Sequence, residues 1–404
     1  MSDCSRSKLS MASCYLIRAL WIQQEISYIS YNVAMNIIEV RGKIFQRLYT
    51  GALKPALFRL DPELVHDRIS SLGVLLGTNL ATRTATKLSF AYQNAVLRQT
   101  IQGIRFANPI GLAAGFDKNA KLTQILPSVG FGWMEVGSIT ARLCAGNNGK
   151  RLHRLPKSKS LVVNYGLMND GVDAVLDRLK NLKFEIPVGT SIAPTNDQEA
   201  ADYRMAIEDY SYSYQQLAHV GSYTTLNLSC PNTCHDQPFV DPKKLDELLM
   251  AVKKIPTHKP IFIKLSPDLA FAAVDELLTV AKKYGVAGVI CTNLTKKRDP
   301  EKIKDGDVPE RGGLSGGLVR EQSDALISHV FKTWGNTFTI VGCGGVFSAE
   351  DAYRKIRLGA SLIQLITGMV YEGPQLIGQI NQGLVELLHR DGFNSISEAV
   401  GMDV

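Results

Sequence analysis

The chain has 404 residues, of which 45% are hydrophobic, so it can bury a large core and exceeds the ~100–200 residues of one ordinary domain. Its formal charge of +7 comes from 45 basic residues scattered among 38 acidic ones, without a basic stripe interleaved with aromatic residues, which argues against nucleic acid as a partner. Seven cysteines without regular spacing indicate reduced thiols rather than a disulfide framework, and no run approaches the ~18–20 apolar residues that span a bilayer.

The first 34 residues form a tail whose role the sequence leaves open. The segment between Cys14 and Val40 is rich in aromatic and aliphatic residues, which fits an interfacial anchor or a targeting segment. It lacks a small-residue cleavage site typical of a secretory signal. Upstream translation before a true start at Met35 is the third interpretation.

Residues 35–86 are predicted to form a helical unit. Apolar residues recur there at spacings of three and four, and Asp61-Pro62 provides an N-cap followed by proline at the first helical position. A small helical unit with two apolar faces, placed before the main domain, is expected to bury those faces against another surface. It either packs on that domain or leaves a groove for a hydrophobic ligand or a membrane.

Strand and helix patterns then alternate over residues 87–392, and residues 393–404 form a C-terminal tail. Eight short apolar runs are each followed by polar or glycine-rich residues, at 110–114, 133–137, 187–192, 223–228, 260–265, 288–292, 338–341 and 362–366. Helical patterns separate most of them, at 119–128, 172–182, 200–220, 243–254, 271–284, 319–332, 349–358 and 375–388. Parallel strands need crossover helices and eight strands close a sheet, so the predicted α/β fold is a (β/α)8 TIM barrel with an N-terminal helical extension. The excursion at 141–160 is expected to be a hairpin-like lid or insertion.

Residues that directly follow the strands of such a barrel share one mouth, where the chemistry of this fold takes place. In this sequence they include two lysines, several carboxamides, one thiol and two glycine-rich loops, with almost no carboxylate and no repeated histidine. Because paired acids and divalent-metal ligands are lacking in this set, neither hydrolysis by two carboxylates nor a metal site is predicted. The set favours a polar ligand with anionic parts and a phosphate.

Three features of the mouth carry the candidate chemistry. Gly344 and Gly345 after the seventh strand and Gly368 after the eighth place bare N–H groups where phosphate-binding barrels have them, although ordinary turns also use glycine. Lys264 is charged within an apolar run and needs an anionic partner, which is either a ligand or a structural acid. The loop from Asn227 to Thr233 contains Cys230, and it is either a reactive loop or a turn with a small buried cysteine.

Several segments, in order along the chain, match one family. They are Asn108 to Lys118, Gly130 to Thr140, Asn227 to Thr233, Ile263-Lys264, Cys291 to Asn293, Gly312 to Gly316 and Gly342 to Gly345. Over about residues 55–390 the chain closely resembles the dihydroorotate dehydrogenases, FMN-containing barrel enzymes of pyrimidine biosynthesis. The resemblance implies a cofactor set of Ala114, Gly115, Ser138, Ser191, Asn227, Lys264, Thr292, Gly316, Gly344, Gly345, Thr367 and Gly368. It implies that orotate is held by Lys118, Asn164, Asn169, Asn227, Asn232 and Asn293.

The resemblance also implies a reaction, the FMN-dependent oxidation of dihydroorotate to orotate. Cys230 would remove the C5 proton while a hydride passes from C6 to flavin N5, and Lys264 would stabilise charge at the N1 and O2 edge of the reduced flavin. A thiol has an ordinary pKa near ~8.5 and ionises more readily than a hydroxyl, so it is able to act as a general base.

Two signals within the family conflict. The N-terminal helices with His66, and the segment from Ala360 to Gln364, resemble the membrane-associated class 2 enzymes, which use quinone. Cys230 stands where class 2 enzymes generally have Ser, and a Cys there is typical of the soluble class 1 enzymes. We judge the acceptor from the helices and expect quinone.

The sequence departs from the family pattern at three places. At the first substrate asparagine, either Asn164 matches through a gap or Val163 occupies that position. Ser191 stands where the family commonly has a flavin-contacting Asn, and Ile366-Thr367 replaces a Tyr-Ser pair. The changes at Ser191 and Ile366-Thr367 keep or shorten hydrogen-bonding groups, so a slightly altered flavin pocket is expected.

With quinone as acceptor we expect peripheral attachment to an inner or cytoplasmic membrane, which is the mitochondrial inner membrane in a eukaryote. One alternative is a class 1-like enzyme that passes electrons to fumarate or another soluble acceptor. Another is a flavoenzyme that acts on a different dihydropyrimidine. The third is a barrel that binds phosphate-containing ligands without redox chemistry.

Overall fold

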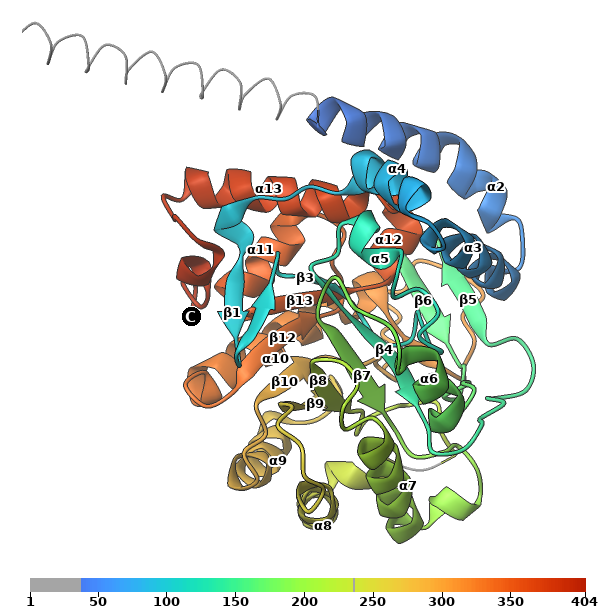
Figure 1. Ribbon diagram of the computed structural model, residues 1–404, viewed down its shortest axis with the longest axis vertical. Coiled ribbons are helices and arrows are strands. Elements are labelled where there is room, and N and C mark those ends of the chain that lie inside the picture. The colour runs from blue at the N-terminus through green and yellow to red at the C-terminus, as the bar shows by residue number, and fades with distance from the viewer. Residues whose placement is uncertain (1–37, 235–236) are drawn as a thin grey trace, which may run out of the picture. The chain divides into compact units, whose positions relative to one another are not determined.

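The structure is a computed structural model that describes residues 38–234 and 237–404 (Figure 1). The predictions for the tail at residues 1–34 lie outside this part of the chain. The chain divides into two compact units, residues 1–45 and 46–404. In the first unit, residues 38–45 are helical and Lys43 pairs with Glu39 one turn earlier. The second unit contains every candidate site residue.

The second unit begins with helices, as predicted. They are η1 (Tyr49–Leu53), α2 (Lys54–Phe58), α3 (Pro62–Gly77) and α4 (Leu80–Phe90). Asp61 caps α3 by accepting hydrogen bonds from the backbone N–H groups of Glu63 at 2.9 Å and Leu64 at 3.0 Å, and Pro62 occupies the first turn. Within the described residues, no helix combines the length and the apolar character that crossing a membrane requires.

A closed barrel of parallel strands follows, which confirms the predicted fold. Around the barrel the order is β10-β12-β13-β3-β4-β7-β8-β9. These strands are β3 (Ile110–Leu112), β4 (Trp133–Ile139), β7 (Val188–Ile192), β8 (Tyr223–Leu226), β9 (Ile261–Leu265), β10 (Gly288–Cys291), β12 (Thr339–Cys343) and β13 (Leu362–Leu365). Each one overlaps a predicted apolar run, because strands covered on both faces are apolar along most of their length.

The helices between the strands lie around the barrel (Figure 1). They are α6 (Val172–Leu179), α7 (Tyr203–Gln216), α8 (Pro242–Lys253), α9 (Phe271–Lys283), α10 (Arg320–Trp334), α11 (Ala349–Arg357) and α13 (Leu376–Arg390). The helix predicted at 119–128 is wrong, because only α5 (Leu126–Val129) forms. The carboxylate of Asp117 accepts hydrogen bonds from the N–H groups of Lys121 and Leu122, both at 2.8 Å, and fixes a turn there instead. A short helix not predicted, α12 (Thr367–Glu372), follows β13.

The amino ends of the strands are closed by an antiparallel hairpin of β1 (Gln99–Ile101) and β2 (Ile104–Phe106). Phe106 packs with Trp133, Tyr223 and Phe262, which come from three barrel strands, and this cluster fills the lower part of the barrel. Trp133 also donates its indole N–H to the carbonyl of Pro109 at 3.0 Å. The polar mouth therefore lies at the other end of the strands.

The insertion after β4 contains a hairpin, as expected. Its strands β5 (Leu152–Leu155) and β6 (Ser160–Val163) pair antiparallel, and β11 (Gly313–Leu314) joins the outer edge of β6 to give a three-stranded sheet. Short 3-10 turns complete the unit at η2 (Ala95–Leu97), η3 (Glu199–Ala201), η4 (Pro238–Val240), η5 (Gly316–Val319) and η6 (Ile396–Ala399). At the C-terminus, Ile396 is buried and Gly401 N donates to Ile356 O at 3.0 Å, so this segment packs on α11.

Candidate active site

Four predicted site residues from the carboxyl ends of different strands form one hydrogen-bonded chain. The hydroxyl oxygens of Ser138 and Ser191 lie 2.9 Å apart, and Asn227 Nδ2 donates to Ser138 Oγ at 2.8 Å. Asn293 Nδ2 in turn donates to Asn227 Oδ1 at 2.9 Å. Residues separated by up to 155 positions in sequence thus line one polar surface, as the barrel prediction required.

The loop after β8 that contains Cys230 is anchored on both sides. Ser229 Oγ donates to the carbonyl of Lys264 at 2.8 Å, and Asn293 Nδ2 donates to the carbonyl of Ser229 at 2.9 Å. The hydroxyl of Tyr210 donates to the carbonyl of Asn227 at 2.8 Å. These bonds fix the backbone before the thiol, and Asn147 Nδ2 fixes the backbone after it by donating to the carbonyl of Asn232 at 2.9 Å, so Cys230 has a defined position at the mouth.

The Cys230 side chain is half-buried, and its surroundings disfavour the thiolate. Burial raises the pKa of Cys230 to about 11, while a backbone hydrogen bond from Asn232 and the charge of Lys264 act in the opposite direction. At neutral pH the thiol is therefore protonated. The role of Cys230 as a general base stays a prediction, and this pKa lies above the ordinary ~8.5 of a thiol.

A buried acid, Glu135 on β4, lies below the mouth and was missed in the sequence. It is fully buried and accepts hydrogen bonds from Thr225 Oγ1 at 2.7 Å, Tyr223 Oη at 3.3 Å and Gln364 Nε2 at 3.3 Å. Its other oxygen, Oε1, has no hydrogen-bond partner among the described residues. Burial raises the pKa of Glu135, and the charge of Lys264 opposes that rise. The signal in the sequence that could have identified Glu135 is an acidic residue in the middle of an otherwise apolar predicted strand.

Lys264 extends from β9 and is only 5% exposed. It interacts electrostatically with Glu135 and with Cys230. Glu135 is therefore a structural acid near this lysine, and contact of Lys264 with a ligand stays a prediction.

Lys118, in the loop after β3, lies over an aromatic ring. Its Nζ is 3.7 Å from the centroid of the Tyr165 ring. Burial lowers the pKa of Lys118 to about 8, against the attraction of Asp67 and Glu63. An anionic ligand would favour the charged ammonium here.

Asn164 and Asn232 meet through a residue that the sequence analysis did not single out. Asn147 Nδ2 donates to Asn164 Oδ1 and to the carbonyl of Asn232, both at 2.9 Å, and Asn196 Nδ2 donates to Asn147 Oδ1 at 3.2 Å. Asn232 Oδ1 is buried without a hydrogen-bond partner among the described residues. That free acceptor matches a ligand with an N–H group.

Asn169 has a different environment from the other predicted substrate residues. Its Nδ2 donates to Thr140 Oγ1 at 2.7 Å and Leu167 O at 2.8 Å. Its Oδ1 accepts from Thr140 N at 3.2 Å and Gly171 N at 2.9 Å. The carboxamide thus holds the loop together, and its contact with substrate stays a prediction.

The remaining predicted cofactor residues surround the glycine loops. Gly115 N donates to Gly137 O at 2.7 Å, next to Ala114, and Thr292 N donates to Cys343 O at 2.8 Å, beside Gly344. Thr367 Oγ1 lies 2.8 Å from Ser315 Oγ and so joins the start of α12, where Gly368 lies, to the turn at Gly316.

Two of these glycines have backbone conformations that exclude a side chain. Gly345 has φ +73°, and a Cβ there would lie 2.4 Å from Cβ of Arg320. Gly316 has φ +74°, and a Cβ there would lie 2.4 Å from the carbonyl of Lys159. At these two positions only glycine fits, because the neighbouring atoms lie too close to the backbone for any side chain.

Within residues 38–234 and 237–404, no group of three or more His, Cys, Asp or Glu side chains has a geometry that holds a metal ion. His235, a possible metal ligand next to Cys234, was not part of that set because it lies outside the described residues. The cysteines Cys144, Cys230, Cys291 and Cys343 form no disulfide within the described part of the chain.

Comparisons with known proteins agree with this geometry. A sequence model described as dihydroorotate dehydrogenase matches residues 96–388. The dihydroorotate dehydrogenase (quinone) of Natronomonas pharaonis is 39% identical over 355 residues, which cover 87% of this chain and 98% of the relative. The dihydroorotate dehydrogenase (quinone) of Trichormus variabilis is 38% identical over 376 residues, which cover 88% and 99%. The crystal structure of DHODH from Eimeria tenella in complex with ferulenol superimposes with a TM-score of 0.76 at 28% identity, over 87% of this chain and 98% of that one. The chain therefore belongs to the dihydroorotate dehydrogenase family.

Proposed function

We propose that this protein oxidises dihydroorotate to orotate with bound FMN and passes the electrons to a quinone. The observation that supports this most is the meeting of Lys264, the Cys230 loop and two close-packed glycine turns at one mouth of the barrel. Lysine and the glycine turns suit an anionic, phosphate-bearing cofactor, and the thiol suits proton removal beside it.

The residues present fit FMN. The backbone at Gly316, Gly344, Gly345 and Gly368 would hold its phosphate, with the Thr367 and Ser315 hydroxyls between the two turns. The isoalloxazine ring would lie over a surface made by Ala114, Gly115, Ser138, Ser191, Asn227 and Thr292, beside Lys264. FMN supplies the hydride acceptor of the reaction. Lys264 contributes a fixed positive charge that stabilises negative charge developing at the mouth.

The substrate would be held by carboxamides and one cation. Dihydroorotate carries a carboxylate and ring N–H groups. Lys118 would bind the carboxylate, and the unpaired Asn232 Oδ1 would accept from a ring N–H. Asn227 and Asn293 are already joined at 2.9 Å and present a preorganised pair. Asn164 and Asn169 complete the proposed substrate set.

Cys230 would take the C5 proton of dihydroorotate. Because the pKa of the thiol is about 11, it must lose its own proton before it accepts the one from C5. The charge of Lys264 favours that ionisation. Exclusion of water by the substrate would strengthen the attraction between the thiolate and the lysine.

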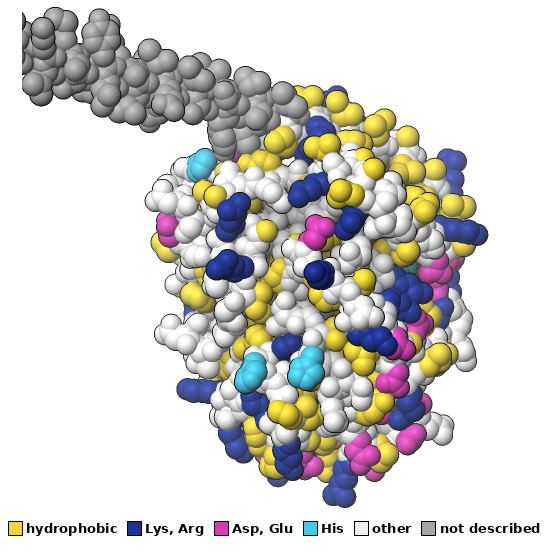
Figure 2. All heavy atoms as spheres, viewed as in Figure 1, with side chains coloured by type: hydrophobic (Ala, Val, Ile, Leu, Met, Phe, Trp, Pro, Cys, Tyr) yellow, Lys and Arg dark blue, Asp and Glu magenta, His cyan; other side chains and the backbone are white. Residues whose placement is uncertain are grey.

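Quinone access and peripheral membrane contact are proposed for the helices between residues 46 and 90. Figure 2 shows hydrophobic side chains over these helices. Those most exposed include Leu48, Leu53, Leu60, Leu64, Leu72, Leu75, Leu80 and Leu88, with exposures between 47% and 72%. Arg154 reaches this region, since its NH1 donates to the carbonyl of Leu60 at 2.8 Å. An apolar face with a cation at its edge suits a quinone head group and a lipid surface.

The test is an anaerobic experiment on the purified protein. We expect a yellow protein whose flavin is bleached by dihydroorotate and reoxidised by a short-chain quinone. Flavin that dihydrouracil bleaches and dihydroorotate does not would contradict the substrate. Reoxidation by fumarate and not by quinone would contradict the acceptor and favour the class 1-like alternative that Cys230 suggests.

A further inference from the structure

Lys355 on α11 is a fully buried lysine that takes no part in the proposed flavin contacts or proton transfer. Its side chain is 0% exposed, and its ammonium group donates to Asp324 Oδ1 at 2.6 Å and to Ser323 Oγ at 2.9 Å. Because the side chain has no exposed surface, a bound ligand lies out of its direct reach. Lys355 acts on a ligand only through the residues that it holds.

Ser323 on α10 connects this lysine to the ends of two barrel strands. Its hydroxyl donates to the carbonyl of Cys343 at 2.8 Å and lies 3.1 Å from the carbonyl of Cys291. An ammonium group only donates hydrogen bonds, so Ser323 Oγ accepts from Lys355, and its single hydrogen is left for these carbonyls. The lysine therefore fixes the direction in which the serine donates.

The two carbonyls directly precede residues of the proposed FMN site. Cys343 ends β12 and is followed by Gly344, and Cys291 ends β10 and is followed by Thr292. Thr292 N also donates to the carbonyl of Cys343 at 2.8 Å. A Cβ added at Gly344 would lie 2.8 Å from Val319 Cγ1, so this turn packs closely against the residue before α10.

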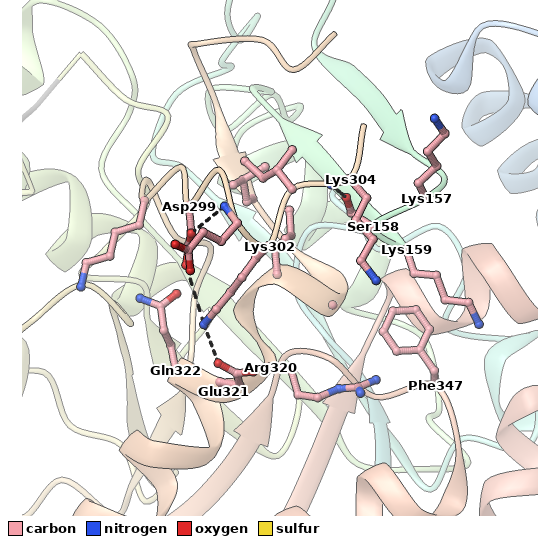
Figure 3. Close-up of a pocket in the computed structure, with 16 residues that line it drawn as sticks. Lys157, Ser158, Lys159, Asp299, Lys302, Lys304, Arg320, Glu321, Gln322 and Phe347 are labelled. Atoms are coloured by element: carbon pink, nitrogen blue, oxygen red, sulfur yellow. Dashed lines mark hydrogen bonds and ion pairs between the residues drawn. The ribbon is translucent and has the colours of Figure 1, made fainter. Parts of the chain in front are cut away.

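Arg320, the first residue of α10, holds the next residue of the turn. Its Nε donates to the carbonyl of Gly345 at 2.9 Å, and its Nη2 pairs with Asp351 Oδ2 at 3.1 Å. The same carboxylate oxygen accepts from Phe347 N at 2.9 Å. Figure 3 shows the Arg320 side chain extending toward Phe347, whose ring centroid is 5.6 Å from the guanidinium carbon. Arg320 and Ser323 thus fix successive parts of one turn.

Stability of the fold does not by itself account for a cation at position 355. Taking an ammonium group out of water is costly, and replacement of a buried ion pair by apolar side chains is often neutral or stabilising. Burial lowers the pKa of Lys355, and the carboxylate of Asp324 opposes that change. Asp324 also pairs with Arg354 at 2.9 Å, so it keeps a cationic partner when Lys355 is replaced. What an apolar side chain lacks here is the hydrogen bond to the serine.

We propose that Lys355 is a positioning residue for the phosphate of FMN. Through Ser323 it fixes the carboxyl ends of β10 and β12, and thereby the backbone N–H groups of the turn at Gly344 and Gly345. A phosphate held by backbone N–H groups binds more tightly when these groups are oriented before it arrives. The inference rests on the proposed function, because it assumes that the bound cofactor is FMN.

The test compares Lys355→Met with Lys259→Met in the FMN-loaded, full-length protein. Lys259 is a matched control, because its ammonium group donates to the carbonyls of Leu217 and Val220, both at 2.6 Å, just before the amino end of β9. Dilution of the loaded protein gives the Kd of FMN from the recovery of flavin fluorescence. We expect Lys355→Met to raise this Kd ~10-fold, as for the loss of one charge-assisted hydrogen bond, and Lys259→Met to leave it unchanged.

Two further measurements separate positioning from general structural damage. At saturating FMN, the phosphorus NMR resonance of the cofactor should shift in Lys355→Met. The flavin midpoint potential should stay unchanged, because the phosphate contacts are the same in oxidised and reduced FMN. Ser323→Ala should raise the Kd by a similar factor, and the double variant should raise it no further, because the lysine acts through the serine.

Three results would overturn the positioning role of Lys355. They are an unchanged Kd in Lys355→Met, a midpoint potential that moves together with the Kd, and effects of the two substitutions that multiply in the double variant. An unmodified protein that takes up no flavin would refute the proposed function and this inference with it. Flavin uptake by the unmodified protein therefore distinguishes failure of the inference from failure of the function.

Discussion

The pKa of Cys230 makes a prediction about the rate of flavin reduction. If the thiolate is the base, the rate of anaerobic reduction by dihydroorotate depends on the fraction of Cys230 that is ionised. Burial raises the pKa of this thiol to about 11. At pH 7 the thiolate fraction is then ~10⁻⁴, against ~0.03 for an unperturbed thiol with a pKa near ~8.5.

The sign and size of the pH effect follow directly. A group that must lose a proton, with a pKa above the working range, gives a rate that rises about tenfold for each pH unit. We expect the reduction rate to rise ~100-fold between pH 7 and pH 9. Replacing Cys230 by Ala should slow reduction by ~10²–10⁴ and flatten this dependence.

Stopped-flow measurement of the visible flavin band, with dihydroorotate in excess, isolates this half of the reaction from the acceptor. Cys234→Ala is the matched control, because it removes a neighbouring exposed thiol four residues away and should leave rate and slope unchanged. A Cys230→Ala protein with the full slope would show that another group titrates. A rate unchanged by that substitution would remove Cys230 from the mechanism.

Four further results are expected. Lys264→Ala should lower the flavin midpoint potential in a redox titration and slow reduction by ~10²–10³, because a fixed positive charge beside the reduced cofactor is lost. Glu135→Gln should have a higher melting temperature than the wild type, by an amount that grows as the pH rises above ~4.3. Burial raises the pKa of Glu135, so the folded wild type keeps a proton that its unfolded chain has released, and its stability falls as the pH rises. The variant has no carboxyl at this position and lacks this loss of stability. Gly345→Ala should cost ~1–3 kcal/mol in urea unfolding and release flavin on gel filtration, since its φ is +73° and the added Cβ has no room. The double substitution Leu72→Ser and Leu75→Ser should weaken co-sedimentation with lipid vesicles ~10-fold or more without changing bleaching by dihydroorotate, since both side chains are about half exposed or more, at 49% and 64%.

The barrel was predictable because its strands are covered on both faces and are therefore apolar along their length. The N-cap at Asp61 was predictable for a different reason, since capping depends on residues adjacent in sequence. The same local logic failed at residues 119–128, where the side chain of Asp117 accepts two backbone hydrogen bonds and a turn replaces most of the helix. The spacing of apolar residues, from which the helix was predicted, contains no information about a side chain that binds the backbone N–H groups.

The candidate site was predictable as a set of residues and not as a network. Each residue after a strand was identifiable, but the contact between Asn147 and the two asparagines Asn164 and Asn232 joins loops 17 and 85 positions apart. Glu135 was missed because it points into the barrel from the middle of β4, whereas the predicted site residues lie at or after the carboxyl ends of the strands. Its burial depends on the closure of all eight strands, which no local pattern encodes.

The conflict between Cys230 and the quinone-type helices is smaller than the residue types suggest. A thiol with a pKa of about 11 is, like a serine hydroxyl, almost entirely protonated at neutral pH. As the proposed base, either group would have to lose its own proton before it accepts the one from C5. A Cys for Ser exchange therefore alters the rate and pH dependence of proton removal. We expect it to leave the route of the electrons unchanged, because the loop after β8 is held by Ser229, Asn293 and Tyr210, and none of these residues belongs to the helices of residues 46–90. We propose that the base and the acceptor are set by separate parts of the chain. The relatives from Natronomonas pharaonis and Trichormus variabilis, which match 87% and 88% of this chain, are dihydroorotate dehydrogenases (quinone).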